Sequence, residues 1–226
     1  MNYTKETFRP AAVIFDMDGT VIDTEKVFIS AWEMAGKLYG YNIAKDTMLH
    51  MLGLGKKAFR AAMLEQFGAD FQYEQIDNDR QKFYDEEFEK SGVSKKPGLD
   101  YLLDCLANAK IPVGLATSRP KERAFLFLNK VGILDKFTAI TCGDEIKNGK
   151  PAPDIFLLTA ERLGQSPSTC VGFEDSTAGL KALAAAGMRS IFIKDLIDPP
   201  QEVLATVWHH CHDLAEAVPL LQLNEN

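Results

Sequence analysis

The residues of this chain that could do chemistry together are several carboxylates, two hydroxyls and a lysine. Each stands directly after a short apolar run, or a short loop beyond one: Asp16, Asp18, Thr117, Ser118, Lys150, Glu174 and Asp175. Converging carboxylates form a hard-oxygen site of the kind that Mg2+ prefers. A carboxylate can also accept a phosphoryl group as a nucleophile, while a lysine screens the phosphoryl charge. The set therefore indicates metal-assisted phosphoryl transfer, if the fold brings its members together.

The apolar runs before these residues read as buried strands. They occupy residues 11–15, 111–116, 139–142, 169–173 and 190–193. Helical patterns lie between or beside them, at residues 99–109, 120–131, 154–163 and 177–186. Fully apolar short strands that alternate with helices predict an α/β fold, a Rossmann-like parallel sheet covered on both faces. In such open sheets ligands bind beyond the carboxyl ends of the strands, so the polar residues are expected to gather there.

A long segment after the first strand breaks this alternation. It has no buried-strand run and shows helical patterns at residues 27–39, 45–52, 56–67 and 73–91. Pro97-Gly98 marks its far end, as is typical of a break between elements. We therefore expect an inserted α-helical cap domain at residues 24–96, and a discontinuous α/β catalytic core made of residues 1–23 and 97–226.

The composition limits the classes of function. Of 226 residues, 46% are hydrophobic and 25% charged, which suits a folded protein with a sizeable core. The formal net charge of −7 argues against general nucleic-acid binding, which depends on Lys and Arg contacts to phosphates. The four cysteines are widely spaced, and the polar start of the chain has no signal-peptide pattern. We expect a cytoplasmic protein with reduced thiols and no membrane span.

Four short motifs in a fixed order make the family recognisable. D-x-D-G-T follows the first strand, Thr-Ser the second, Lys-Pro the third and Glu-Asp the fourth. This order resembles the four motifs of the haloacid dehalogenase superfamily, in the group with a helical cap after the first strand. Each motif alone is common, but four in order at strand ends are specific. The stretches GKPAPDIF and GFEDSTAGLKA look like those of β-phosphoglucomutase and its phosphatase relatives.

The resemblance implies catalytic roles for the residues of the first three motifs. Asp16 would be the nucleophile and Asp18 the general acid/base. Thr117 and Lys150 would support the phosphate and the nucleophile. Ser118 is a candidate for substrate binding as well, although Pro120 after it also suggests that Ser118 caps a helix.

The same resemblance implies a magnesium cofactor. Asp16, the backbone carbonyl of Asp18 and Asp175 would hold the ion, with Glu174 nearby. Asp175 and Ser176 are also placed to cap the helix that follows them.

The leading function is therefore a phosphatase that acts on a small sugar- or polyol-phosphate-like metabolite. The alternative is a phosphomutase of the β-phosphoglucomutase type. Those mutases have a histidine and an arginine in the cap where this chain has Phe28 and Lys56. Phe28 cannot exchange a proton, whereas Lys56 could bind an anionic group of the substrate. A catalytically silent binding protein on the same fold is a weaker third reading. The expected partner is a phosphorylated metabolite rather than nucleic acid or membrane, and the expected assembly is a monomer or weak dimer.

Two other patterns are set aside. Residues 143–150 resemble a phosphate-binding loop, but the spacing of the glycines is one residue too long and Pro151 replaces the required Ser/Thr. The cluster His209, His210, Cys211 and His212 suggests a transition-metal site. Neighbours on an extended segment point to opposite faces, so we expect a late edge strand there instead.

Overall fold

The computed structural model describes residues 6–52, 54 and 56–223, apart from the side chains of Lys56 and Ser91. The chain divides into two compact units. One consists of residues Met1–Asp23 and Lys95–Asn226, and the other of residues Thr24–Ser94. Each unit has its own core and is described by itself.

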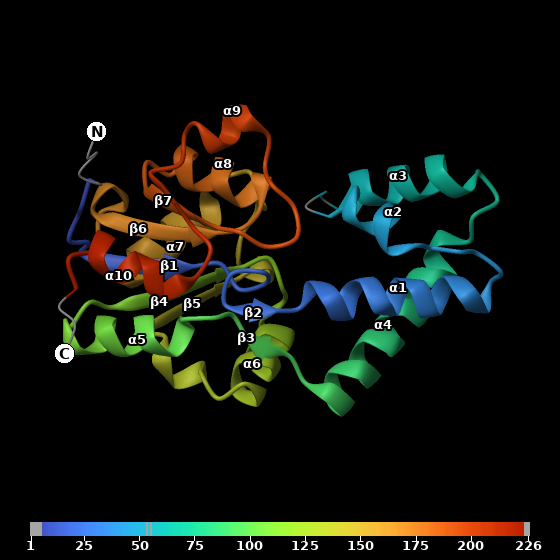
Figure 1. The fold of residues 1–226 in the computed structure, drawn as a ribbon, viewed down its shortest axis with the longest axis horizontal. Helices are drawn as coiled ribbons and strands as arrows, with labels where there is room; N and C mark the ends of the chain where they lie inside the picture. The colour runs from blue at the N-terminus through green and yellow to red at the C-terminus, as the bar shows by residue number, and fades with distance from the viewer. Residues whose placement is uncertain (1–5, 53, 55, 224–226) are drawn as a thin grey trace. The chain divides into compact units, whose positions relative to one another are not determined.

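Within the described residues the larger unit contains a six-stranded sheet, in the order β5-β4-β1-β6-β7-β8, and every pair of neighbours is parallel (Figure 1). The strands are β1 (Ala12–Phe15), β4 (Val113–Thr117), β5 (Ala139–Cys142), β6 (Cys170–Glu174), β7 (Arg189–Ile193) and β8 (His209–Cys211). β1, β4 and β6 are buried along their whole length. The predicted parallel α/β core is thereby confirmed, and β8 is the edge strand expected around the histidine cluster.

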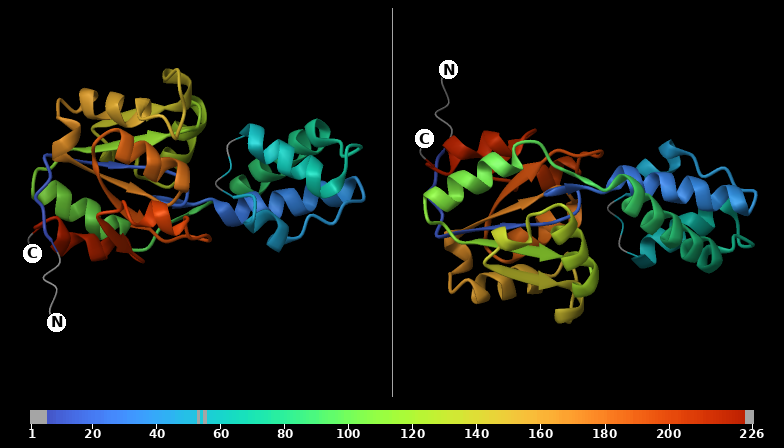
Figure 2. Two further views of the ribbon diagram at one scale, coloured as in Figure 1. Left: turned by 90° about the horizontal axis from the view of Figure 1, so that it is seen from above. Right: turned by 90° about the horizontal axis from the view of Figure 1, so that it is seen from below.

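Helices cover both faces of this sheet. They are α5 (Leu99–Asn108), α6 (Lys121–Lys130), α7 (Asp154–Arg162), α8 (Thr177–Ala185), α9 (Gln201–Leu204) and α10 (Ala217–Leu220). α7 packs against β1, β4 and β5 and touches α8, while α5 and α10 lie together on the opposite side of the sheet (Figure 2). Ile14, Phe156 and Leu183 belong to the buried cluster under α7 and α8. This two-sided burial explains why the strands are apolar throughout.

The smaller unit is helical. Its helices are α1 (Glu25–Leu38), α2 (Lys45–Leu49), α3 (Lys56–Phe67) and α4 (Tyr73–Ser91), close to the four predicted segments. α1 packs along α4, and Trp32 stands among the rings of Phe59 and Tyr73 at centroid distances of 5.3 and 5.8 Å. An aromatic core therefore holds this unit together. Two short strands lie at the boundaries of the two units along the chain, β2 (Ile22–Asp23) at the end of a segment of the larger unit and β3 (Ser94–Lys95) across the other boundary. They form a separate two-stranded sheet that the sequence patterns did not predict.

The predicted helix caps had different outcomes. Ser118 does not cap α6: the residue before that helix is Pro120, and the amide of Lys121 instead donates a 3.0 Å hydrogen bond to Oδ1 of Asp144. The prediction for Ser118 was wrong because a carboxylate distant in sequence serves that helix end. At α8 the prediction was right for Ser176, whose Oγ accepts a hydrogen bond from the amide nitrogen of Gly179 at 3.0 Å.

No helix in the described part of the chain is both long enough and apolar enough to span a membrane.

Candidate active site

Asp16 and Glu174 stand side by side at the carboxyl edge of the sheet. Asp16 directly follows β1, and Glu174 is the last residue of β6. The two strands are parallel neighbours, with Phe15 in register with Phe173. β1 is also the strand at which the order turns, since β4 and β5 lie on one side of it and β6 to β8 on the other. This switch point is where α/β sheets open a crevice for ligands.

Lys150 joins both of these carboxylates. Its Nζ donates a hydrogen bond to Oδ1 of Asp16 and another, at 2.6 Å, to Oε1 of Glu174. The three side chains are buried, with 7%, 10% and 1% of the Lys150, Asp16 and Glu174 side chains exposed. Nζ also lies 4.9 Å from the centroid of the Phe156 ring. One buried cation therefore faces two buried carboxylates, which leaves a surplus of negative charge.

Burial and the charges of neighbouring groups determine the pKa values of Asp16 and Lys150. The pKa of Asp16 is raised to about 7: burial is the largest cause, the attraction of Lys150 opposes it, and the negative charges of Glu174 and Asp18 add to the increase. Burial alone would lower the pKa of Lys150, but the attraction of Asp16 and Glu174 outweighs it and raises that pKa. Lys150 therefore keeps its charge, and a second cation beside Asp16 would favour the ionised carboxylate.

A divalent cation fits the site. One carboxylate oxygen each from Asp16, Glu174 and Asp175 lies within 4.8 Å of the other two. These are hard oxygen donors, and Asp175 adds a further negative charge to the surplus around Lys150. The structure therefore brings together three of the four predicted metal ligands through their side chains. Asp18 was expected to contribute its backbone carbonyl, and its side chain has another partner.

The turn after β1 makes room for the carboxylate of Asp175. Gly19 has a φ of +79°, and a Cβ atom on it would lie only 2.2 Å from Oδ2 of Asp175. The next residue, Thr20, is fully buried and donates a 3.1 Å hydrogen bond from Oγ1 to Oδ1 of the same carboxylate. Gly19 and Thr20 of the D-G-T sequence therefore position the carboxylate of Asp175, which follows the neighbouring strand β6.

Glu174 is fixed by the start of α8. Its Oε2 accepts hydrogen bonds from the amide nitrogen of Ser176 at 2.7 Å and from Oγ of Ser176 at 2.9 Å. A Cβ atom on Gly179 would lie 1.7 Å from Oε1 of Glu174. Together with the hydrogen bond from Lys150 to Oε1, Glu174 accepts three hydrogen bonds. They hold its carboxylate in one position, and the carboxylate in turn orients Lys150.

Asp18 is bound by a residue that sequence reasoning missed. Nε of Arg119 lies 3.0 and 2.8 Å from the two carboxylate oxygens of Asp18, and its Nη2 lies 2.7 Å from Oδ1. Thr117, fully buried, accepts a 3.1 Å hydrogen bond at Oγ1 from the amide of Arg119. Ser118 between them is exposed. The available signal was a basic residue two positions beyond the end of β4, beside the predicted hydroxyls.

Lys56, the remaining predicted residue, begins α3, but its side chain lies outside the described residues. Within the same helical unit, Phe28 is half-buried, and its ring centroid lies 6.4 Å from that of Trp32 and 5.9 Å from that of Phe59. The guanidinium of Arg80 stands 5.5 Å from the Phe28 ring. Phe28 therefore packs in the aromatic core of its unit.

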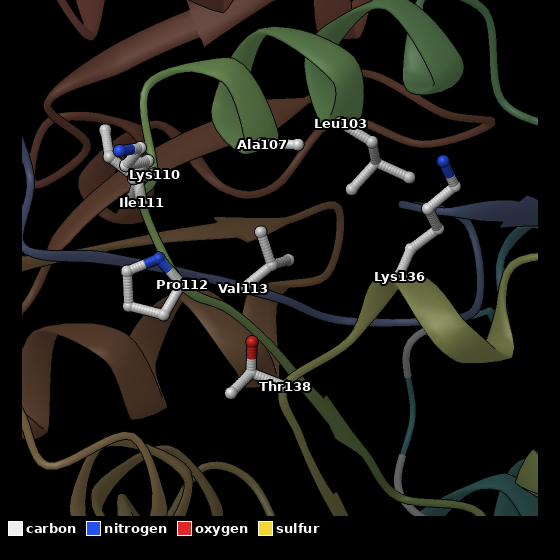
Figure 3. A pocket seen from close by; sticks show the side chains of 8 residues that line it. All are labelled: Leu103, Ala107, Lys110, Ile111, Pro112, Val113, Lys136 and Thr138. Atoms are coloured by element: carbon white, nitrogen blue, oxygen red, sulfur yellow. The ribbon is translucent and has the colours of Figure 1, made fainter.

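A separate pocket lies at the other end of β4. It has a volume of about 310 Å3, and Leu103, Val113 and Lys136 are among the residues that line it (Figure 3). Val113 is the first residue of β4 and Thr117 the last. The pocket is thus at the amino end of the strand and is not part of the carboxylate site.

Comparisons with known proteins identify the family of this chain. A family model described as haloacid dehalogenase-like hydrolase matches residues 10–187. The phosphorylated carbohydrates phosphatase of Thermotoga maritima is 31% identical over 183 residues, which make up 80% of this chain and 83% of that protein. The β-phosphoglucomutase of Bacillus subtilis is 32% identical over 186 residues, or 80% of this chain and 81% of that one. The solved structure of β-phosphoglucomutase from Clostridium difficile matches with a TM-score of 0.72 at 26% identity, covering 92% of each chain. The resemblance seen in the motifs is confirmed: the chain belongs to the haloacid dehalogenase-like hydrolase family and is an enzyme of that class.

Proposed function

We propose that this enzyme is a Mg2+-dependent phosphatase of small sugar- or polyol-phosphate-like metabolites, acting through an aspartyl-phosphate on Asp16. The observation that carries the proposal is the buried contact of Lys150 with both Asp16 and Glu174 at the switch point of the sheet. A fixed cation beside a carboxylate nucleophile offsets the repulsion between that carboxylate and a phosphate ester. The substrate class is supported by the similarity to a phosphatase of phosphorylated carbohydrates.

The residues divide the reaction between them. Asp16 attacks phosphorus, and the bond to the leaving oxygen breaks in line with the new bond. Asp18 gives a proton to the leaving alkoxide and later takes one from the water that attacks the aspartyl-phosphate. Lys150 screens the phosphoryl charge and keeps Asp16 oriented. Thr117 and Ser118 provide hydroxyls for hydrogen bonds to the phosphoryl oxygens of the substrate. The product of the second step is inorganic phosphate, and Asp16 is regenerated.

Magnesium is the proposed cofactor. Asp16 and Asp175 would hold it together with the backbone carbonyl of Asp18, and Glu174 would lie close by. When bound, the ion supplies charge that stabilises the phosphoryl oxygens during transfer. The residues themselves prepare the site, since Gly19 leaves space for Asp175 and the hydroxyl of Thr20 orients it.

A phosphomutase remains the second candidate because of a specific contact. A mutase must restrain its acid/base until the phosphorylated product returns, and Arg119 binds both carboxylate oxygens of Asp18. We still favour the phosphatase, because Phe28 packs in its own aromatic core and has no proton to exchange.

Two product assays separate these functions. The purified protein with Mg2+ is given a panel of phosphorylated metabolites, β-glucose 1-phosphate with a trace of the bisphosphate included. Phosphorus NMR then follows inorganic phosphate and isomerised sugar phosphate separately. We expect net release of phosphate, and loss of several orders of magnitude in turnover for Asp16→Asn. Glucose 6-phosphate that forms faster than phosphate would establish the mutase. Substantial turnover by Asp16→Asn would reject Asp16 as the nucleophile.

A further inference from the structure

The carboxylate of Asp195 has one oxygen that is buried without a hydrogen-bond partner. Asp195 lies two residues beyond β7, at the same edge of the sheet as Glu174, which is in register with Phe192 of β7. Its Oδ1 accepts a 2.8 Å hydrogen bond from Nζ of Lys96. Its Oδ2 is buried and has no hydrogen-bond partner in the part of the chain that the structure describes. A buried carboxylate oxygen in this state costs free energy unless a donor or a cation reaches it.

The unpartnered oxygen borders the turn that positions Asp175. A Cβ atom on Gly19 would lie 3.0 Å from Oδ2 of Asp195 and 2.2 Å from Oδ2 of Asp175, so both oxygens border the space that this glycine leaves open. One carboxylate oxygen of Asp195 also lies within 4.8 Å of one carboxylate oxygen of Asp175. Two carboxylates at this distance repel each other, and a hydrogen-bond donor or a cation beside both of them offsets the repulsion.

Lys96 holds Asp195 in place. The side chains of Lys96 and Asp195 are only 10% and 9% exposed. The backbone amide of Lys96 donates a 2.9 Å hydrogen bond to the carbonyl oxygen of Val21, two residues beyond Gly19. The ion pair therefore links the loop after β7 to the turn after β1. Because Lys96 occupies Oδ1 of Asp195, Oδ2 is the oxygen that is available to a further partner near Asp175.

The charges of the site match one divalent cation. Six charged side chains contribute: Asp16, Glu174, Asp175, Asp195, Lys96 and Lys150. Four are carboxylates and two are lysines, so two negative charges stay uncompensated within this set when all six are ionised. Asp195 is not a member of the group of three carboxylates that includes Asp16. Since Mg2+ usually keeps several water ligands, a water bound to the ion is the donor that fits an oxygen outside that group.

We infer that Asp195 is a positioning residue for the metal, and that its Oδ2 accepts a hydrogen bond from a water molecule bound to the divalent cation. Lys96 orients Asp195 for this contact. Asp195 belongs to none of the four motifs that carry the family resemblance, because it follows β7 and not one of the four strands that precede them. The inference rests on the proposed use of Mg2+ and adds a residue outside the predicted ligands.

Calorimetric titration of the protein with Mg2+ alone, without substrate, tests the inference. Asp195→Asn keeps the shape of the side chain but removes its charge, and it should weaken Mg2+ binding by about tenfold or more. Asp198→Asn is the matched control, because Asp198 lies on the same loop and its removal changes the net charge equally. Asp198 pairs with Lys194, and its side chain is 56% exposed. Because water and salt screen that charge, the control should change the Mg2+ affinity by less than about twofold.

A double variant separates metal positioning from the ion pair. Asp195→Asn alone leaves Lys96 buried without its partner, and this change by itself can disturb the turn after β1. Lys96→Met combined with Asp195→Asn removes both charges, so the net charge equals that of the wild type. We expect the double variant to bind Mg2+ about tenfold or more weakly than the wild type. If it regains the wild-type affinity, Asp195 serves only as the partner of Lys96 and the inference is wrong.

A crystal structure of the wild type with Mn2+ determines the manner of contact. We expect Oδ2 of Asp195 at hydrogen-bond distance from a water ligand of the ion, and a direct bond between Oδ2 and Mn2+ would overturn the inference. If Asp195→Asn binds Mg2+ as tightly as the wild type, the inference is also wrong, while the proposed phosphatase and its cofactor stand. If the wild type binds no Mg2+ and releases phosphate from no metabolite, both proposals fail.

Discussion

Nζ of Lys150 lies 2.6 Å from Oε1 of Glu174, and the same Nζ donates a hydrogen bond to Asp16. The amide and the hydroxyl of Ser176 both donate hydrogen bonds to Oε2 of Glu174. Lys150 is therefore bound to a carboxylate whose position is fixed. This arrangement keeps a charged lysine against the proposed nucleophile in a buried site. Because the side chains of Lys150, Asp16 and Glu174 are shielded from bulk water, the loss of one charge should affect the stability of the fold.

Lys150→Met should destabilise the fold. Removing the cation leaves the buried carboxylates of Asp16 and Glu174 without compensation, and breaking a buried ion pair in this way costs about 3 kcal/mol or more. The loss should shrink as the pH falls, because Asp16 can then bind a proton. Urea unfolding of both proteins at pH 8 and pH 6 measures the difference. An equal loss at the two pH values would show that charge is not the cause, and Lys147→Met, on the exposed loop before it, is the control.

The raised pKa of Asp16 predicts how metal binding depends on pH. With a pKa of about 7, Asp16 still holds its proton where an ordinary carboxyl, near 3.8, has lost it. In the metal-free protein this lowers stability as the pH rises from about 4 to about 7, because the folded state keeps a proton that the unfolded chain has released. A metal needs the ionised form, so the Mg2+ affinity should rise by up to about tenfold per pH unit below that pKa and level off above it.

Calorimetric titration of Mg2+ between pH 6 and pH 8 checks this, with proton release measured in buffers of different ionisation enthalpy. Asp16→Asn should bind Mg2+ more weakly and lose most of the pH dependence. A wild-type affinity that stays flat over this range would contradict the prediction.

The two carboxylates of the last motif should differ in their effect on the metal. Glu174 is engaged by Lys150 and Ser176, whereas Asp175 accepts a hydrogen bond from the hydroxyl of Thr20. Asp175→Ala should therefore raise the Mg2+ concentration needed for half-maximal activity more than Glu174→Gln does. Glu174→Gln should act mainly on kcat, because it disturbs the position of Lys150. Metal-activation curves for the two variants test this order, and the reverse order would show that Glu174 is the stronger metal ligand.

Gly19→Ala should impair metal binding through a collision rather than through backbone strain alone. The new Cβ atom would stand 2.2 Å from Oδ2 of Asp175. Gly132→Ala is the matched control, since Gly132 has a similar φ of +71° but no heavy atom within 4 Å of the added Cβ. Both changes should cost about 1–2 kcal/mol of stability, because an L-residue is strained in that conformation. Only Gly19→Ala should also lose activation by Mg2+. If the two variants show the same dependence of activity on Mg2+ concentration, the proposed steric role of Gly19 is wrong.

Local pattern was enough to predict the strands of the main sheet and the longer helices, but not the four-residue helices α9 and α10. The strands of the parallel sheet are short and apolar throughout because both faces are buried, and the helices keep a helical spacing of apolar residues. The conserved geometry of such sheets then places Asp16, Thr117 and Glu174 at one edge without further information. β2 and β3 escaped prediction because strands of two residues have no period to read.

What the sequence alone determined is therefore the fold, the family and the edge of the sheet at which the polar residues gather. The tertiary structure decided which of those residues touch. Arg119 and Asp18 are 101 residues apart, and Lys150 and Asp16 are 134 apart, so no local pattern links them. The same holds for Asp144, which serves the start of α6 in place of Ser118. Backbone periodicity is a property of neighbours along the chain, whereas ion pairs depend on distances that exist only after the sheet has brought the strand ends together.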